Sequence, residues 1–171
     1  GDSGMAVALV GGRPILKKVV PGSPAYKAGL RVGYQIVSVN GESFANLKKT
    51  VESSGVFKNV IPFYLEKSVE NRWYGSLGES VELVAKSGAF GTSKRYAFKL
   101  RTYEGLMSEQ LGNFGTMPME IETRILEGEV AYLRFDIWFP GLMVAMRNFV
   151  RSLGDDVSGL VIDVRGNPGG I

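Results

Sequence analysis

The chain has 171 residues, of which 44% are hydrophobic and 22% are charged, and its net charge at pH 7 is +3. These values are ordinary for a globular chain, so they exclude a mainly disordered, collagen-like or mucin-like protein. The sequence has no cysteine and no histidine, which excludes a histidine base, a cysteine nucleophile, Cys/His zinc sites and any disulfide framework. Ser, Thr, Lys, Tyr, the carboxylates and backbone dipoles remain available for catalysis.

Charge divides the chain into two parts. Residues 1–102 carry ten lysines and five arginines against seven acidic residues, whereas residues 103–171 carry five arginines, ten acidic residues and no lysine. The segment 103–117 lacks a clear periodicity and is predicted to be a linker between a domain at 4–102 and a second domain at 118–171. The small net charge gives no indication of nucleic-acid binding, and no run of 18 apolar residues predicts a transmembrane helix.

The first domain is predicted to consist of short strands and short helices. Ser23 and Pro24 are typical of a helix start, and Gly29 is typical of a helix end. Asn40 and Gly41 form a tight-turn signal after the third strand. The predicted strands are 5–10, 14–20, 35–39, 81–85 and 96–100.

Apolar spacing predicts two further features of the first domain. A helical stripe recurs every four residues at Leu65, Val69, Trp73 and Leu77. In the third strand, alternation places Ile36 and Val39 on opposite faces. Residues 46–63 have no clear pattern, and we expect a helix over Asn46–Ser53 followed by an irregular insertion.

The second domain is predicted to have the order ββαβ. Two strands at 120–126 and 130–135 are expected to pair as a hairpin, and Leu142–Leu153 has helical spacing. Gly159–Val164 is an almost continuous apolar run, which is typical of a strand buried on both faces. This order suits a larger α/β domain, so we expect the chain to be a fragment of a longer protein.

One segment of the first domain has a specific order of features. Residues 21–41 read PGSPAYKAGLRVGYQIVSVNG, in which a capped helix, a glycine stop, a tight turn, a strand and an Asn-Gly turn follow one another. This order resembles the PDZ domains of bacterial proteases, with Tyr34 where that family usually has an acidic residue. A generic β-hairpin with a helix does not account for the whole order.

The resemblance to a PDZ domain implies a peptide-binding groove. A terminal carboxylate would bind to backbone N–H groups just before the first strand, where Ala6 replaces a glycine of the family pattern. The peptide would then add as a strand beside residues 5–10. The alternative is that these residues are ordinary core. The predicted substrate-binding residues are Gly4, Met5, Ala6, Val7, Leu65 and Val69.

A second motif lies at residues 159–170, which read GLVIDVRGNPGG. A strand followed by a glycine-rich turn exposes backbone N–H groups at the strand end, which suits an oxyanion hole or another anion site. A structural strand-to-helix turn is the alternative. Asp163 and Arg165 alternate on the strand, and we expect them to form a structural pair.

Taken together, the two motifs resemble the C-terminal-processing (tail-specific) serine peptidases over residues 4–171. In that family a PDZ domain recognises the C-terminal tail of the substrate, a Ser/Lys dyad hydrolyses the peptide bond, and glycines of the Asn-Pro-Gly-Gly turn form part of the oxyanion hole. The resemblance therefore implies Gly169 and Gly170 as catalytic candidates. The family's serine and lysine follow this turn, so we expect the parent protein to be a serine endopeptidase and this chain alone to be inactive.

The resemblance also implies partners and a location. We expect the partners to be C-terminal tails of unfolded or precursor proteins, with no nucleic acid, no metal and no other cofactor, and a periplasmic or otherwise exported location; the oligomeric state is not predicted. Two alternatives stay open, namely a PDZ-type protein-binding module without catalysis and a catalytically dead, ligand-binding relative of the peptidase fold.

Overall fold

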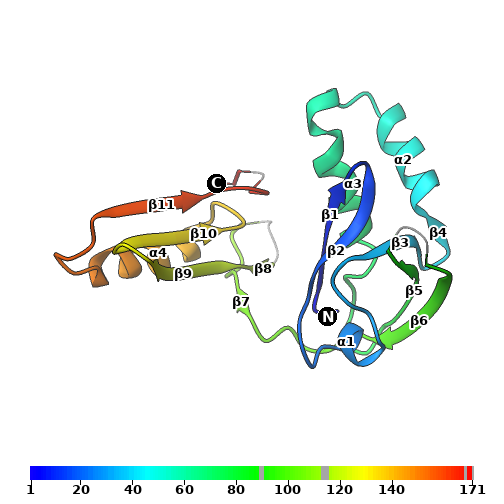
Figure 1. The fold of residues 1–171 in the computed structure, drawn as a ribbon, viewed down its shortest axis with the longest axis horizontal. Helices are drawn as coiled ribbons and strands as arrows, with labels where there is room; N and C mark the ends of the chain where they lie inside the picture. The colour runs from blue at the N-terminus through cyan, green and yellow to red at the C-terminus, as the bar shows by residue number, and fades with distance from the viewer. Residues whose placement is uncertain (89–90, 113–115, 168, 171) are drawn as a thin grey trace. The chain divides into compact units, whose positions relative to one another are not determined.

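The protein, described here by a computed structural model, folds as two compact units, Gly1–Tyr103 and Glu104–Ile171 (Figure 1). The structure describes residues 1–88, 91–112, 116–167 and 169–170. The predicted fold class is confirmed, because a PDZ-like arrangement of strands and helices is followed by a ββαβ portion. The segment 103–117, expected to be a linker, contains a short strand that belongs to the second unit.

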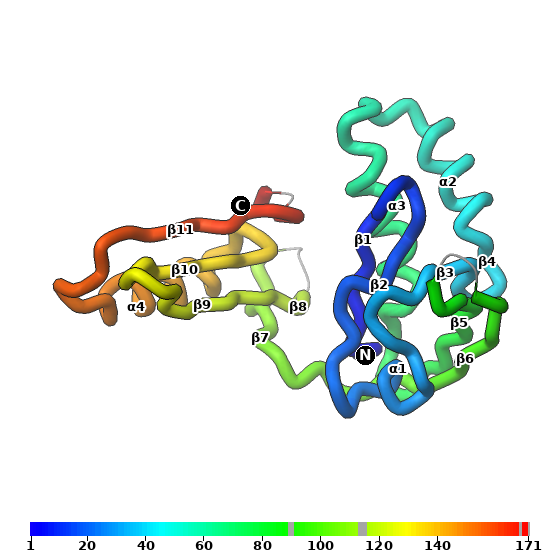
Figure 2. The backbone as a smooth tube through the Cα atoms, in the orientation of Figure 1, coloured from blue at the N-terminus to red at the C-terminus, as the bar shows by residue number. Residues whose placement is uncertain are grey.

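The first unit is built on a six-stranded antiparallel sheet in the order β1-β2-β3-β5-β6, with β4 paired to β3. The strands are β1 (Met5–Val10), β2 (Arg13–Val19), β3 (Tyr34–Val39), β4 (Glu42–Ser43), β5 (Ser80–Ser87) and β6 (Ser93–Lys99). The helices are α1 (Pro24–Lys27), α2 (Phe44–Ser53), the 3₁₀ helix η1 (Lys58–Val60) and α3 (Ile61–Glu70). Strand β1 is at one edge of the sheet, and α3 runs beside it (Figure 2).

Side-chain hydrogen bonds stabilise the start of α1 and the turn after β3, at the positions that the sequence predicted. The Ser23 hydroxyl accepts a hydrogen bond from the Tyr26 backbone N–H at 3.2 Å and caps α1. Asn40 and Gly41 both have positive φ, 48° and 81°, as a tight hairpin turn requires. The Asn40 side chain also accepts a hydrogen bond from the Glu82 backbone N–H at 2.8 Å, which ties this turn to β5.

The predicted alternation in β3 was wrong. Ile36 and Val39 are both buried, each with 1% of its surface exposed. The register between β3 and β5 shifts between Ile36 and Ser38, and an extra residue in one strand moves the following side chains to the other face. Both residues therefore belong to the core.

The predicted helical stripe ends earlier than its spacing suggested. Helix α3 ends at Glu70, so Trp73 reaches the core from the loop that follows, where it is fully buried. Leu77 is 68% exposed and does not belong to the stripe. The four-residue spacing was correct for Leu65 and Val69, which lie on the helix and are buried.

The two ends of the first unit pair with each other. The Asp2 backbone N–H donates to the Arg101 carbonyl at 2.7 Å, and the Arg101 N–H donates to the Asp2 carbonyl at 3.1 Å. The Arg101 Nε atom also lies 3.5 Å from the Asp2 carboxylate. Residues near the two ends of this unit are thus joined side by side.

The second unit contains the predicted ββαβ order. Strands β9 and β10 form an antiparallel hairpin, α4 follows, and β11 pairs with β10 in parallel. The elements are β7 (Leu106–Met107), β8 (Pro118–Met119), β9 (Ile121–Leu126), β10 (Val130–Phe135), α4 (Pro140–Ser152) and β11 (Gly159–Asp163). Leu142 of α4 packs on Leu133 and Phe135 of β10 to form its core. Among the described helices, none has the length and apolar character needed to cross a membrane.

The prediction that the last strand is buried on both faces was wrong. Leu160, Val161 and Ile162 of β11 are 41%, 44% and 52% exposed. The strand pairs with β10 along one edge, while the apolar contacts of α4 go to β10. In the described part of the chain, the apolar side chains of β11 therefore stay largely uncovered.

Candidate functional site

The predicted carboxylate-binding loop, residues 4–7, was expected to precede the first strand, but only Gly4 does so, because β1 begins at Met5. Gly4 has a φ of 74°, and a Cβ at this position would overlap the side chain of Ser23, so glycine is required there. Its N–H donates to the Asp2 carboxylate at 2.8 Å, and the Met5 N–H donates to the Ser3 hydroxyl at 3.3 Å. The first two amides of the predicted loop thus have partners within the chain.

Ala6 stands where the family pattern has a glycine, and the structure places it inside β1. It does not have a positive φ, so a side chain is compatible with its backbone. The pairing of β1 with β2 shifts its register between Ala6 and Val7. The departure from the family pattern therefore causes no backbone strain at this position.

The outer edge of β1 is bonded to two carboxylates of α3. The Val7 N–H donates to Glu70 Oε1 at 3.2 Å, and the Leu9 N–H donates to Glu66 Oε1 at 2.8 Å. Glu70 is 6% exposed, and its other oxygen accepts a hydrogen bond from Lys67 Nζ at 2.9 Å. Side-chain oxygens thus occupy the positions that the carbonyl groups of an added strand would take.

The apolar residues predicted to contact the last side chain of a peptide are all buried. Met5, Val7 and Val69 belong to the core of the first unit, and Leu65 is 3% exposed. The structure thus brings the predicted groove residues together between β1 and α3, with their apolar side chains in contact with the protein interior.

Sequence reasoning missed Glu66 and Glu70. A signal was present, because each follows directly after an apolar position of the α3 stripe, at Leu65 and Val69. Two carboxylates four residues apart lie on one face of a helix. That spacing could have been interpreted as a pair of acceptors for the neighbouring strand.

The glycine-rich turn holds the two predicted oxyanion candidates at the end of the second unit. The Gly169 N–H donates to Asn167 Oδ1 at 2.8 Å, and the Gly169 carbonyl accepts from the Trp138 N–H at 2.9 Å. Gly170 forms a parallel bridge with Trp138. A Cβ on Gly170 would overlap the Trp138 carbonyl group, so this contact requires glycine.

Asn167 is a third residue that sequence reasoning missed. Besides accepting from Gly169, its amide donates to the Phe135 carbonyl at 3.3 Å and so ties the turn to the end of β10. Asn in a turn commonly bonds to the backbone two residues on, which was the available signal. Pro168, which the motif includes, lies outside the described residues.

Asp163 and Arg165 pair as expected, and Tyr132 joins them. The buried Asp163 carboxylate accepts from Arg165 Nη2 at 2.6 Å, from Arg165 Nε at 2.9 Å and from the Tyr132 hydroxyl at 2.8 Å. The Arg165 guanidinium and backbone N–H hold the pKa of Asp163 well below its usual range. The hydrogen bond to Asp163 raises the pKa of Tyr132. This cluster fixes the strand end that leads into the glycine turn.

The second unit is expected to lose stability in acid through this carboxylate. Because the pKa of Asp163 is depressed in the folded state, its contribution is present above its unfolded pKa of about 4 and is lost as the pH falls toward the folded pKa. Asp163→Asn should lower the unfolding temperature at pH 7 and flatten its fall below pH 4. Thermal unfolding between pH 7 and pH 2 measures both effects. The exposed Asp155→Asn is the matched control, and identical profiles for the two variants would contradict the prediction.

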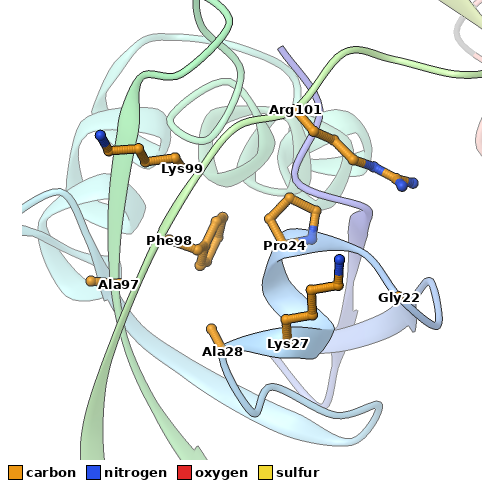
Figure 3. A pocket seen from close by; sticks show the side chains of 8 residues that line it. All are labelled: Gly22, Pro24, Lys27, Ala28, Ala97, Phe98, Lys99 and Arg101. Atoms are coloured by element: carbon orange, nitrogen blue, oxygen red, sulfur yellow. The ribbon is translucent and has the colours of Figure 1, made fainter.

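A pocket of about 450 Å³ lies elsewhere on the first unit, between α1 and β6. Lys27, Lys99 and Arg101 stand around Phe98 there (Figure 3). Strand β6 is at the opposite edge of the sheet from β1, so this pocket is separate from the predicted groove. In the described ranges, no three acidic side chains gather in a way that could hold a metal ion.

Comparisons with known proteins bear on both motifs. Residues 15–53 match the PDZ domain family. The chain is 28% identical over 172 aligned residues to the carboxy-terminal processing protease CtpB of Bacillus subtilis (strain 168), with 98% of this chain and 29% of that protein covered. The chain thus spans less than a third of the length of this curated relative.

Two solved structures are also similar. A photosystem II C-terminal processing protease aligns with a TM-score of 0.46 and 21% identity, over 99% of this chain and 41% of that one. Mature CPAF aligns with a TM-score of 0.48 and 15% identity, over 98% of this chain and 41% of that one. The resemblance predicted from the two motifs is confirmed by the family match and the curated relative: the chain is similar to a carboxy-terminal processing protease, and its residues 15–53 match the PDZ domain family.

Proposed function

We propose that the first unit binds the free C-terminal tails of unfolded or precursor proteins. The observation that carries this proposal is the outer edge of β1, which no strand covers within the described sheet and whose amides bond to carboxylate oxygens. A peptide that pairs with this edge would offer carbonyl oxygens and a terminal carboxylate to the same amides. The match of residues 15–53 to PDZ domains supports this mode of binding.

We further propose that the chain is part of a serine endopeptidase that works outside the cytoplasm. Gly170 would supply an oxyanion-hole contact there, and Gly169 would do so once its N–H leaves Asn167 Oδ1, the acceptor that positions the turn in this structure. The nucleophile and base belong to the parent enzyme, because residues 103–171 contain no lysine that could form a local Ser–Lys pair. A serine-directed phosphonate is therefore expected to block the full-length enzyme.

Removing the negative charge of the C-terminal carboxylate of a tail peptide should weaken its binding to the 171-residue chain. A decapeptide that ends in Ala-Val with a free carboxylate is expected to bind with a Kd on the order of micromolar, since ordering the peptide offsets much of the contact energy. Amidation of its C-terminus should weaken binding about tenfold or more, because charge-assisted hydrogen bonds are lost. Fluorescence anisotropy with the labelled acid and amide measures both constants. Equal affinities for the two peptides would exclude recognition of the terminus.

A further inference from the structure

The hydrogen bonds along the outer edge of β1 determine how a peptide can enter the groove. Each of the three alternate residues Met5, Val7 and Leu9 donates its N–H to an oxygen of the chain itself. In a strand, alternate residues direct their backbone groups to the same edge. The donors that an added strand would need are therefore already bonded.

Two of these acceptors are carboxylates carried by α3, one turn apart. Glu66 bonds to Leu9 at 2.8 Å and Glu70 bonds to Val7 at 3.2 Å. Glu70 is 6% exposed, and Lys67 at 2.9 Å compensates its charge. Burial of a carboxylate is costly unless it is paired and hydrogen-bonded. The pairing of Glu70 with both a lysine and a strand amide explains why it tolerates this position.

We propose that Glu66 and Glu70 form a built-in competitor, an acidic plug that occupies the edge of β1 until a C-terminal tail displaces it. The plug presents carboxylate oxygens, the same kind of hydrogen-bond acceptor that the C-terminus of the tail carries. Tail binding is then an exchange reaction in which each bond to β1 replaces an existing one. The inference rests on the proposed tail-binding function, and it names the residues that set the affinity.

The competition has a measurable consequence. If the plug is removed, the tail no longer has to break two charge-assisted hydrogen bonds. The double variant Glu66→Ala/Glu70→Ala should therefore bind the free-acid Ala-Val decapeptide roughly tenfold more tightly than the unaltered chain. The amides of Val7 and Leu9 should also exchange with solvent faster in this variant when no peptide is present.

A second double variant separates the plug from simple charge repulsion. Glu66→Gln/Glu70→Gln removes both charges and keeps an oxygen that can accept from β1. If competition governs affinity, the Gln variant should stay within about threefold of the unaltered chain, because its amide bonds are only modestly weaker. If repulsion of the tail carboxylate governs affinity, the Gln and Ala variants should gain equally, which would overturn the plug.

A matched control removes two carboxylates away from β1. Glu52→Ala/Glu82→Ala alters α2 and β5, where both side chains are substantially exposed, at 49% and 41%. This variant should bind the decapeptide as the unaltered chain does. Circular dichroism of each variant establishes that the sheet is retained before affinities are compared.

The experiment distinguishes failure of the plug from failure of the proposed function. Binding of the decapeptide by the unaltered chain, with no gain in the Ala variant, would overturn the plug and leave tail binding in place. Absence of binding by the unaltered chain and by the Ala variant would overturn the tail-binding function and the plug together. Unchanged exchange of the Val7 and Leu9 amides in the Ala variant would independently contradict the plug.

Discussion

Replacement of Trp73 by alanine is expected to destabilise the first unit by about 3–5 kcal/mol, the range for truncating a large buried aromatic residue. Trp73 is fully buried in the core although it lies in the loop after α3. Its indole contacts the cluster that includes Val69 of α3 and Leu83 of β5. Removing it leaves a cavity where the helix meets the sheet. Denaturant unfolding followed by circular dichroism measures the loss.

Trp73→Phe is the matched variant. The Trp73 indole N–H is buried and has no hydrogen-bond partner among the described residues. Burial of this unpaired donor lowers the stability of the native protein. Phenylalanine removes that donor and keeps most of the ring, and we expect less than half of the alanine effect. Equal losses for the two variants would show that the ring does not fill the core as described.

In the full-length serine endopeptidase proposed above, Gly170→Val is expected to lower turnover roughly a hundredfold to a thousandfold, the usual cost of losing one oxyanion donor. A side chain at this position overlaps the Trp138 carbonyl, so the turn has to move. The Gly170 amide, proposed above as an oxyanion donor, is then displaced from its position. Peptidase assays should show the loss in kcat, while tail-peptide affinity of the first unit stays unchanged. The 171-residue chain serves as the negative control and should show no peptide hydrolysis.

Gly166→Ala is the control for this substitution. Gly166 also has a positive φ, 78°, but an added Cβ there would have no atom within 4 Å. It introduces backbone strain in the same segment without the overlap, so we expect a much smaller loss of turnover. Full turnover of Gly170→Val would show that the turn is merely structural. Loss of tail binding as well would contradict the assignment of tail binding to the first unit alone.

Local signals predicted most elements of the fold. The Ser23 cap and the Asn40 turn are set by chemistry within a few residues, and the structure has both. The ββαβ order of the second unit also follows from local apolar spacing. Such features depend on neighbours in the sequence, which the sequence displays directly.

The remaining features depend on partners that are distant in the sequence. The register shift at Ile36 arises from pairing with β5, and the bond between Glu70 and Val7 joins residues 63 positions apart. Ile162 fits a buried strand by composition, but its exposure depends on which layers cover β11. Spacing within one segment carries no information about those contacts. For the candidate site, the motifs predicted which residues form it. The carboxylates that accept hydrogen bonds from the β1 amides could be identified only from the tertiary structure.

The pairing of Asp2 with Arg101 has a consequence for biosynthesis. A ribosome delivers Asp2 nearly a hundred residues before Arg101, so the backbone pairing of these two residues has to wait until the end of the unit has emerged, whereas β1 can pair with β2 much earlier. Contacts of such long sequence separation are slow to form because the loop between them must close first. The pairing of Asp2 with Arg101 is therefore expected to be a late step in the folding of this unit. In the folded unit the two ends lie next to each other. A domain with adjacent ends can be inserted into another chain and still keep its own fold.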